Sequence, residues 1–443
     1  MRQMFKGRTQ DDSLEDQQAV LSGALPLVGH GVSFARNRLA LLERARALGP
    51  GTVILVPDPV VVVSEPDDVQ HVLVGNPSGY VKGPKLASER GTRVFGAGLL
   101  TQHGTSHRRL RLLIQPAFHR LAATRLEQVL HDALETTLRG WQPGPRDVHG
   151  ELMAGARLAI QRVLFGELPD AEAVDRAIAE RRAFAQRWFT TLNPRPEWLP
   201  TPANLRYRRT EAWFRRRVAE LVDERLAEPE AHEDLLALLV ASRDRSQDRL
   251  SRDELITEAL SLTIPGHETT GESLAWTLDL LARHPEEQER ARASARVHER
   301  ATLERIVDES LRLYPPTWVT VRVATADDTM PSGTVVRRGR RLYLSPWLLH
   351  RDARWWKDPD RFDPDRFLSD ADPDRPRRAY LPFGAGPRVC IGERLAKTEL
   401  IEALLLVLPR FELRPVGRPP TPDPGLTLSP RGGVPILLEE PAS

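Results

Sequence analysis

Apolar residues recur at helical spacing along most of the chain, and strand-like alternation is confined to short stretches. The helical pattern is nearly continuous over residues 121–250, and the longest single helical run covers residues 253–283, roughly 45 Å at the usual rise per residue. Shorter helical patterns cover residues 39–48, 65–74, 99–116, 301–314 and 391–408. These patterns predict a mainly α protein.

Short runs of β-branched residues predict small sheets beside the helices. Residues 52–56 and 60–64 flank a Pro-Asp-Pro turn and predict a hairpin, and residues 425–429 and 434–438 predict a second one near the end. Single strands are expected at residues 319–323 and 341–345. The fold class expected is therefore mainly α with small β-sheets (α+β). Without a repeat or a clear linker, residues 1–443 are predicted to form one domain, with residues 1–22 poorly ordered.

Proline interrupts the helical pattern at two places of interest. Residues 193–202, NPRPEWLPTP, separate two helical patterns, and this segment is either a rigid connector or a lid over a cavity. Within residues 253–283, Pro265 lacks the amide that would bond the Ser261 carbonyl, and Gly266 weakens the helix further. The central helix is therefore predicted to be interrupted beside Glu268 and Thr269. That distortion either serves chemistry or is a structural kink capped by Thr269.

Composition narrows the class of protein. The 443 residues have 40% hydrophobic content and a formal charge of +2, which implies no strong attraction to nucleic acid or to an anionic membrane. No apolar run approaches the ~18 residues of a membrane span. The polar N-terminus lacks a signal-peptide core. A cytoplasmic, soluble monomer without a nucleic-acid partner is therefore expected.

The single cysteine, Cys390, excludes an internal disulfide and lies in the stretch LPFGAGPRVCIGER. It is either a small buried hydrophobe or a reactive group. Four neighbours surround it at fixed spacing: Phe383, Gly386, Arg388 and Gly392. A helical pattern starts just after the cysteine, so helix-terminal amides favour a thiolate. Gly384 and Gly386 permit a tight turn and leave room for something flat. We therefore predict a thiolate held against a metal.

Two charged pairs elsewhere leave their roles open. His107 and Arg111 are four residues apart and share one helix face. They form either a solvated basic face or a pair of donors for carboxylates or phosphates. Glu309 and Arg312 are three apart, a spacing that is usually a surface ion pair of little energetic value.

Together these motifs resemble the cytochrome P450 superfamily of haem-thiolate monooxygenases, over most of the chain and in the family's order. The cysteine loop matches F-x-x-G-x-R-x-C-x-G without departure. Glu309 and Arg312 match E-x-x-R, and a later P-x-R-F element contains Arg366. The central helix matches [A/G]-G-x-[D/E]-T at Gly266, Glu268 and Thr269, whereas Pro265 departs from the usual Ala or Gly.

The resemblance implies a role for each matching residue. Cys390 is expected to be the axial ligand of haem b, with Phe383, Gly386 and Gly392 in the cofactor-binding loop. Donors for the haem propionates are implied at four positions: His107, Arg111, Arg322 and Arg388. A buried structural triad is implied for Glu309, Arg312 and Arg366. Glu268 and Thr269 are implied to relay protons in O2 activation.

The reaction that the resemblance implies is insertion of one oxygen atom of O2 into an unactivated C–H bond of a large apolar substrate. Electrons are expected from NAD(P)H through a separate ferredoxin and ferredoxin reductase, for which a basic face around Arg388 and Arg394 offers a docking surface. The compact spacing between residues 285 and 309 and the stretch LRLYPPTW are similar to bacterial carotenoid hydroxylases. Hydroxylation of a carotenoid ring is thus the expected activity, with terpenoid or fatty-acid oxidation as alternatives.

Three other functions fit parts of the sequence. A peroxygenase would use hydrogen peroxide, and a haem sensor or carrier would perform no catalysis. The pair Glu268-Thr269 argues against both, because neither needs an acid and an alcohol in the central helix. A protease-like role for Cys390 finds no supporting arrangement of histidine and acid.

Overall fold

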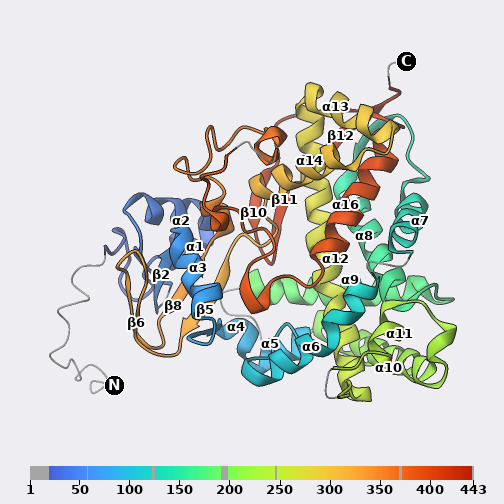
Figure 1. Cartoon of the computed structure of the whole chain (residues 1–443), viewed down its shortest axis with the longest axis horizontal. Helices are drawn as coiled ribbons and strands as arrows, with labels where there is room; N and C mark the ends of the chain where they lie inside the picture. Colours follow the sequence, from blue (N-terminus) through green and yellow to red (C-terminus); the bar gives the residue numbers. More distant parts are fainter. Residues whose placement is uncertain are drawn as a thin grey trace. The chain divides into compact units, whose positions relative to one another are not determined.

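The computed structural model describes residues 19–56, 58–121, 125–190, 198–244, 247–368 and 372–441. The chain forms two compact units. The first unit comprises Met1–Pro84, Trp318–Pro359 and Asp374–Val389, and the second comprises Lys85–Thr317, Asp360–Pro373 and Cys390–Ser443. Helices dominate and strands are short (Figure 1), which confirms the mainly α class with small sheets. The expectation of a single domain stays a prediction.

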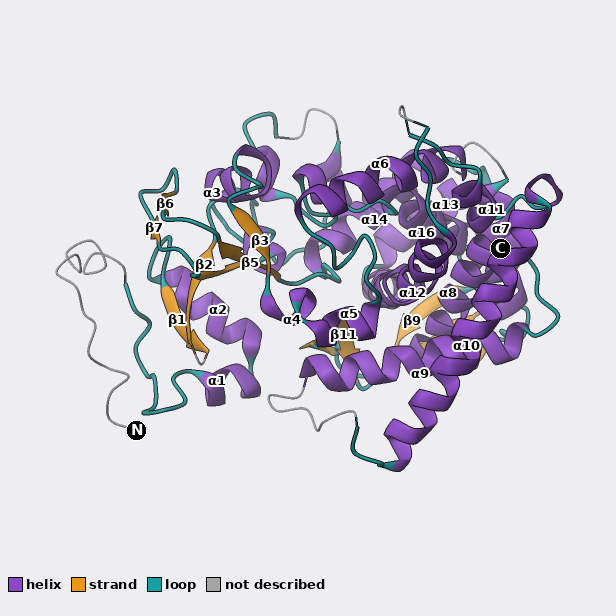
Figure 2. Ribbon diagram, turned by 90° about the horizontal axis from the view of Figure 1, so that it is seen from below, coloured by secondary structure: helices purple, strands orange, loops and turns teal. Residues whose placement is uncertain are grey.

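A five-stranded sheet organises the first unit (Figure 2), in the order β1-β2-β8-β5-β3. Its strands are β1 (Val53–Val56), β2 (Asp58–Val63), β3 (Tyr80–Lys82), β5 (Thr320–Ala324) and β8 (Arg341–Leu344). The predicted hairpin is confirmed, because β1 and β2 pair antiparallel with Val53 opposite Val61. The valines of β2 are buried on both faces, which is why this strand reads as a continuous apolar run.

Short helices and turns complete the first unit. They are α1 (Gly31–Arg36), α2 (Arg38–Ala47), α3 (Pro66–Gln70), α15 (Pro346–Leu349), the π-helical turn η2 (His71–Gly75), and the 3-10 turns η5 (Arg377–Ala379) and η6 (Gly386–Arg388). The strands β6 (Asp328–Thr329) and β7 (Val335–Val336) form a separate pair. The helix predicted at residues 65–74 is thus an α-helix that ends in a wider π-turn.

The second unit contains the longer helices. They are α5 (Glu89–Phe95), α6 (Gly104–Leu121), α7 (Leu126–Leu138), α8 (Val148–Phe165), α9 (Ala171–Thr190), α10 (Pro202–Ala227), α11 (Leu235–Val240), α12 (Arg252–Arg283), α13 (Pro285–Arg296), α14 (Arg300–Leu313) and α16 (Glu393–Val407). The 3-10 turns are η3 (Pro229–Ala231) and η4 (Pro364–Phe367), and α4 (Pro84–Ala87) begins at the last residue of the first unit. The central helix α12 packs against α8, α14 and α16 (Figure 1).

Both prolines that were expected to break helices lie inside continuous ones. Pro265 lies within α12 and Pro116 within α6, so the predicted interruption at Pro265 and helix end at Pro116 are wrong. Each proline removes one backbone hydrogen bond. Packing of α12 on several neighbours outweighs that loss. In α6 the bond lost is to the carbonyl of Leu112, whose side chain is 54% exposed, so this stretch of helix faces water.

The strands near the end of the chain pair with different partners. β11 (Leu428–Arg431) pairs with β10 (Thr421–Pro424), whereas β12 (Pro435–Glu439) pairs with β4 (Gly144–Asp147) and β9 (Glu412–Pro415). The predicted hairpin between β11 and β12 is therefore wrong. Gly432 and Gly433 both have positive φ, and a Cβ at Gly433 would collide with the carboxylate of Asp147, the last residue of β4. These glycines turn the chain toward β4 instead.

Two sequence predictions fall on parts of the chain that the structure does not describe. Residues 1–18 of the segment 1–22, where poor order was expected, lie outside the described residues, as do residues 193–197 of the proline-rich segment. The rest of that segment leads to Thr201, whose side chain accepts a hydrogen bond from the Asn204 amide at the start of α10. Whether the segment is a lid stays a prediction. None of the described helices is both long and apolar enough to cross a membrane.

Candidate active site

Cys390 begins the last segment of the second unit, three residues before α16. The residue has an exposed surface, yet enough protein surrounds its sulfur that burial raises the pKa of the thiol. The backbone N–H of Gly392 and the charge of Arg111 lower that pKa, but by less than burial raises it. Whether the sulfur is held as a thiolate against a metal stays a prediction. The amides act in the expected direction, but desolvation of the charged form dominates.

The glycines before Cys390 lie in the first unit and serve two different needs. Gly386 has a φ of +69°, and a Cβ there would collide with the carbonyl oxygen of Leu73 in η2. The space at Gly386 is thus filled by backbone. Gly384 has a φ of +74°, and among the described residues no atom lies within 4 Å of the position its Cβ would take. The room expected beside the loop is at Gly384, next to the half-buried Phe383.

A cluster of cations lies in the first unit. Lys82 and Arg322 are directly opposite one another on β3 and β5. Burial, followed by the charges of Arg388 and Arg322, lowers the pKa of Lys82 to about 7. Burial and the charge of Arg388 lower the pKa of Arg322 to about 10, and burial also lowers the pKa of Arg388. Desolvated, mutually repelling cations are stabilised by an anion, so this cluster suits negatively charged groups.

Lys82 was missed in the sequence. A signal was present, because lysine is scarce in this arginine-rich chain. The residue also stands in a short strand-like stretch, YVK, bounded by glycines. Which cation lies opposite it became visible only through the pairing of β3 with β5.

The other two predicted donors lie on α6 in the second unit. His107 is 7% exposed, which excludes the solvated basic face for that residue. Arg111 is half-buried, its Nε donates to Gln115 Oε1 at 3.1 Å, and burial lowers its pKa. The negative charge of an ionised Cys390 acts in the opposite direction on that pKa. The structure therefore places Arg111 within electrostatic reach of the sulfur.

Glu309, Arg312 and Arg366 form one buried cluster in the second unit. Arg312 Nε donates to Glu309 Oε2 at 2.6 Å, and both side chains are fully buried. Arg366 of η4 lies 3.5 Å from Glu309 Oε1, which also accepts the Asp363 amide at 2.9 Å. Burial raises the pKa of Glu309, and Arg312 opposes that shift. The pair is thus not the surface ion pair that its spacing alone suggests, and breaking it would leave a buried charge uncompensated.

The acid and the alcohol of α12 have separate surroundings. Thr269 is partly exposed, and its Oγ1 donates to the Pro265 carbonyl at 2.9 Å. Glu268 is 1% exposed and pairs with Arg182 of α9, and its Oε1 accepts the Thr427 hydroxyl at 2.9 Å. Burial raises the pKa of Glu268, whereas Arg182 lowers it. The carboxyl is therefore held in a buried polar cluster, and the hydroxyl faces a more open side of the helix.

The partners of Glu268 were also missed in the sequence. Glu272 follows Glu268 by one helical turn, is fully buried, and shares Arg182 with it. Two acids four residues apart lie on the same face of a helix, and where that face is buried their charges require a cation. That spacing could have indicated a partner, but only the tertiary structure identifies it as Arg182, 86 residues away from Glu268 in the sequence.

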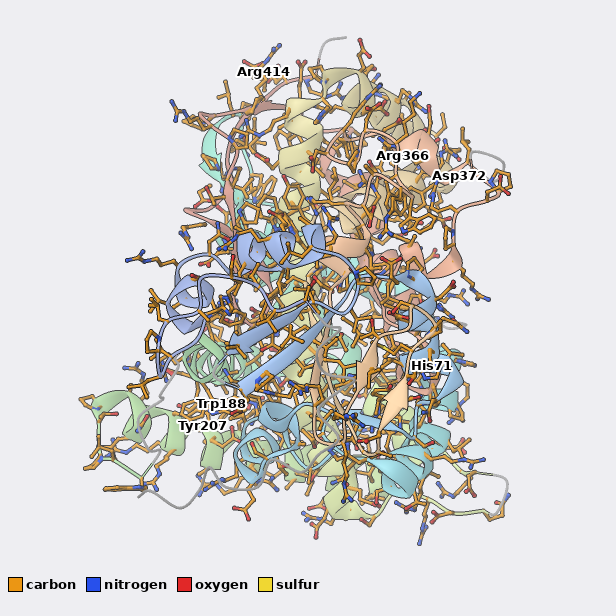
Figure 3. All side chains as sticks on the ribbon, turned by 90° about the vertical axis from the view of Figure 1, so that its left-hand side faces the viewer. His71, Trp188, Tyr207, Arg366, Asp372 and Arg414 are labelled. Atoms are coloured by element: carbon orange, nitrogen blue, oxygen red, sulfur yellow. The ribbon has the colours of Figure 1, made fainter. Side chains whose placement is uncertain are left out.

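An apolar aromatic cluster lies beside the same stretch of α12. It consists of Val94, Phe95, Phe184, Ala185, Trp188 and Ile264, with Leu86, Leu100, Tyr207 and Leu426 packed against it. Phe184 stacks on Tyr207 with ring centroids 3.9 Å apart, and Figure 3 shows Trp188 near Tyr207. Ile264 immediately precedes Pro265. The cluster therefore contacts α12 at Ile264, about one turn before Glu268 and Thr269.

These features define a class of protein before any comparison. A lone cysteine before a helix suits a metal, clustered cations suit an anionic group, and a buried acid beside a hydroxyl suits proton transfer. The combination is typical of a redox enzyme that holds an anionic metal cofactor through sulfur.

Comparison with known proteins gives the family. The family model "Cytochrome P450" matches residues 21–436. The chain is 33% identical over 424 residues to cyclooctat-9-en-7-ol 5-monooxygenase of Streptomyces melanosporofaciens, covering 92% of this chain and 90% of that protein. It is 31% identical over 420 residues to pentalenene oxygenase of Streptomyces avermitilis, covering 88% and 90%. The crystal structure of the cytochrome P450DA haem domain superposes with a TM-score of 0.82 at 24% identity, covering 96% and 98%. This chain belongs to the cytochrome P450 family and is a monooxygenase.

The family implies haem, O2 and electrons from a redox partner, and the residues present fit haem. Its two propionates are anions of the kind that the cation cluster around Arg322 would stabilise. Its iron takes a thiolate, which Cys390 can supply because metal coordination deprotonates a thiol even where burial disfavours the free anion. When bound, haem supplies the activation of O2.

Proposed function

We propose that this cytochrome P450 oxygenates a C–H bond of an apolar terpenoid. The observation that carries the proposal is the apolar aromatic cluster that contacts α12 at Ile264, five residues before Thr269. Aromatic and aliphatic side chains recognise a hydrocarbon skeleton through burial of apolar area. Relatives of similar length and about one-third identity are named for oxygenation of cyclooctatenol and pentalenene, which supports the same substrate class.

Each proposed site residue has a role that follows from its chemistry. Cys390 ligates the iron of haem b, with Phe383, Gly386 and Gly392 shaping the loop. Four residues would hold the propionates: His107, Arg111, Arg322 and Arg388. We add Lys82 to these donors, because an anion would relieve the electrostatic repulsion that Arg322 and Arg388 exert on it.

The remaining residues support the reaction. Glu309, Arg312 and Arg366 hold the core through a buried ion-paired cluster. Glu268 holds a proton in a buried site, and the hydroxyl of Thr269 passes protons toward the reacting oxygen. The apolar cluster around Ile264 orients substrate and excludes water from that side of α12.

Carotenoid ring hydroxylation stays a prediction as the particular activity, because the named relatives favour terpenoids as a class rather than carotenoids. NAD(P)H is proposed as the source of electrons, through a ferredoxin and its reductase. A peroxygenase would turn over faster with hydrogen peroxide than with this electron-transfer chain.

A spin-state titration tests the substrate class. We expect cyclic terpene alcohols and hydrocarbons to displace iron-bound water and shift the Soret band of the ferric holoenzyme with micromolar affinity, about 8 kcal/mol of binding free energy. Phe184→Ala should weaken this binding about tenfold through lost apolar area. Glu89→Gln, an exposed change on α5, is the control. A shift with fatty acids but not with terpenoids would contradict the proposal.

The ligand is tested separately. Ferrous holoenzyme with CO is expected to show the red-shifted Soret band of thiolate ligation, and Cys390→Ser should abolish that band. A Soret band of the histidine type in the unmodified protein would show that Cys390 is not the ligand. Failure of this test removes the haem-thiolate assignment, whereas failure of the titration removes only the substrate class.

A further inference from the structure

Two buried carboxylates of the second unit share one arginine. Glu268 and Glu272 stand one turn apart on α12, with exposures of 1% and 0%. Arg182 of α9 pairs through its Nε with Glu268 Oε2 and donates from Nη2 to Glu272 Oε1 at 3.3 Å. A single guanidinium therefore has to compensate two negative charges, which is unfavourable in a site from which water is excluded.

A second cation reaches the cluster from the surface. His149 of α8 places Nε2 2.9 Å from Glu272 Oε2, and its side chain is 21% exposed. The hydroxyl of Ser429 donates to Glu272 Oε1 at 2.8 Å. Glu272 is thus bonded to groups from α8, α9 and β11, and His149 is the member of the cluster that can exchange protons with solvent.

Charge balance makes one proton decisive. With both carboxylates ionised and Arg182 charged, the cluster is neutral only if His149 is protonated. If His149 is neutral, the excess negative charge is relieved when Glu268 takes up a proton. The cluster thus accommodates one proton, either on the accessible imidazole or on the buried acid.

We propose that Glu272 and His149 are positioning residues that control, through the shared Arg182, how readily Glu268 takes up and gives up its proton. This inference rests on the proposed role of Glu268 as proton donor. Glu272 draws Arg182 away from Glu268 and keeps that carboxyl able to hold a proton. Protonated His149 compensates the negative charge of Glu272. Arg182 is then free to pair with Glu268 alone, and Glu268 stays ionised.

The electrostatics at each member agree with this exchange. Burial lowers the pKa of His149, but the hydrogen bond and charge of Glu272 outweigh burial, so the pKa is raised. The other charged groups that act on His149 are Arg182, which lowers its pKa, and Asp147, which raises it. At Glu268, burial and the charge of Glu272 raise the pKa, and Arg182 lowers it.

Two variants are expected to move Glu268 in opposite directions. Glu272→Gln leaves Arg182 to Glu268 alone, so Glu268 becomes more acidic and less able to donate. His149→Gln leaves Glu272 uncompensated, so Glu268 becomes less acidic. A one-unit change in the pKa of Glu268, in either direction, changes the ratio of its ionised to its protonated form about tenfold. If Glu272 and His149 only supported the fold, both variants would shift the pKa of Glu268 in the same direction, or neither would shift it.

The experiment uses ferrous–CO holoenzyme, which is diamagnetic, and two readouts besides activity. NMR titration of the His149 imidazole should give a pKa above 6.5 in the unmodified protein, lower by about one unit or more in Glu272→Gln. Infrared spectroscopy follows the part of the carboxylic-acid C=O band that disappears in Glu268→Gln. That part should weaken in Glu272→Gln and strengthen in His149→Gln. Asp253→Asn, which removes a charge from the exposed start of α12, is the matched control and should change neither readout.

Turnover distinguishes this inference from the proposed function. Glu272→Gln is expected to divert reductant into free hydrogen peroxide, about tenfold more per product, as Glu268→Gln does more strongly. The inference is overturned if the His149 pKa is unchanged in Glu272→Gln. It is also overturned if both variants shift the pKa of Glu268 in the same direction. If Glu268→Gln leaves the coupling of reductant to product unchanged, the proton relay fails instead, and the two spectroscopic readouts still decide whether the cluster exchanges its proton as proposed.

Discussion

At the scale of single residues, desolvation and specific polar contacts shift the pKa values of buried groups in opposite directions. The Gly392 amide and the charge of Arg111 lower the pKa of the Cys390 thiol, but burial raises that pKa by more. The carboxyl of Glu268 shows the same balance, since Arg182 offsets burial only in part. Each group is therefore held closer to its neutral form than an exposed counterpart. The neutral form is what a proton donor needs, whereas a metal ligand becomes charged only on coordination.

Thr269 is the residue on which we expect proton delivery to depend most directly. Its hydroxyl hydrogen is directed to the Pro265 carbonyl, which leaves the oxygen able to accept on the open side of α12. In Thr269→Ala, product formed per reductant should fall about tenfold or more while free hydrogen peroxide rises. Parallel assays of reductant, product and peroxide measure this.

The adjacent threonine provides the control. Thr270 also donates to the carbonyl four residues earlier, at 3.3 Å, but it is buried. Thr270→Ala should therefore leave coupling largely intact. Equal uncoupling in both variants would indicate a general disturbance of the helix and would exclude a specific role for Thr269.

At the scale of elements, α12 remains continuous because neighbouring elements hold it. Hydroxyl groups at Thr269, Ser273 and Thr277 donate to carbonyls one turn earlier, a contact that tends to bend helices. Most of the helix is buried, and α8 packs closely along it. Tertiary burial therefore stabilises this helix where its own sequence, with Pro265 and Gly266, does not.

Gly266 should be required for the approach of α8 to α12. A Cβ at this position would lie 2.6 Å from Ile160 Cγ1. We expect Gly266→Ala to lower the free energy of unfolding by about 1–3 kcal/mol through overpacking. Ile160→Ala alone should cost about 2–5 kcal/mol through the cavity it leaves. The double variant should be less unstable than the sum, because each change relieves the other.

Denaturant unfolding of the three variants gives this coupling directly. Gly150→Ala on α8 is the control, since no described atom lies within 4 Å of its Cβ position. That change should be neutral or stabilise by about 0.5–1 kcal/mol. Strict additivity of Gly266→Ala and Ile160→Ala would mean that the two side chains do not limit the packing of these helices.

At the scale of the whole molecule, stability depends on pH through buried acids. Burial raises the pKa of Glu258 to about 7, although the Leu99 amide and the Ser261 hydroxyl oppose the shift. The folded protein therefore binds this proton more tightly than the unfolded chain. Its contribution to stability is complete below the unfolded pKa of 4.5 and is lost as pH rises through about 7.

We expect the free energy of unfolding to decrease by up to about 3 kcal/mol between pH 4.5 and 7.5 because of Glu258 alone. Glu258→Gln should remove that decrease, as measured by denaturant unfolding across this range. Glu254→Gln is the control one turn earlier. The pKa of Glu254 is lowered, because hydrogen bonds from Arg109 and Ser251 outweigh burial, so its titration lies below this window. Identical pH dependence in the unmodified protein and Glu258→Gln would contradict the prediction.

Much of the fold could be predicted from local patterns. The long helix of residues 253–283, the hairpin of β1 and β2, and the mainly α class follow from periodicity and turn residues, which act over a few positions. The strands β11 and β12 were located near their observed positions. Their pairing was not predictable, because partners such as β4 come from segments almost 300 residues earlier in the chain.

The sequence by itself identified the groups that we propose carry the chemistry. The covalent chain fixes one cysteine in its loop, the acid and the alcohol of α12, and the arginine-rich motifs. The spacing of these groups identifies the family. Only the tertiary structure decided what surrounds them. It gave Glu268 an arginine from α9, placed Lys82 beside Arg322, and buried the pair Glu309–Arg312. Burial and long-range charge depend on segments that meet only on folding, and these two effects set proton affinities.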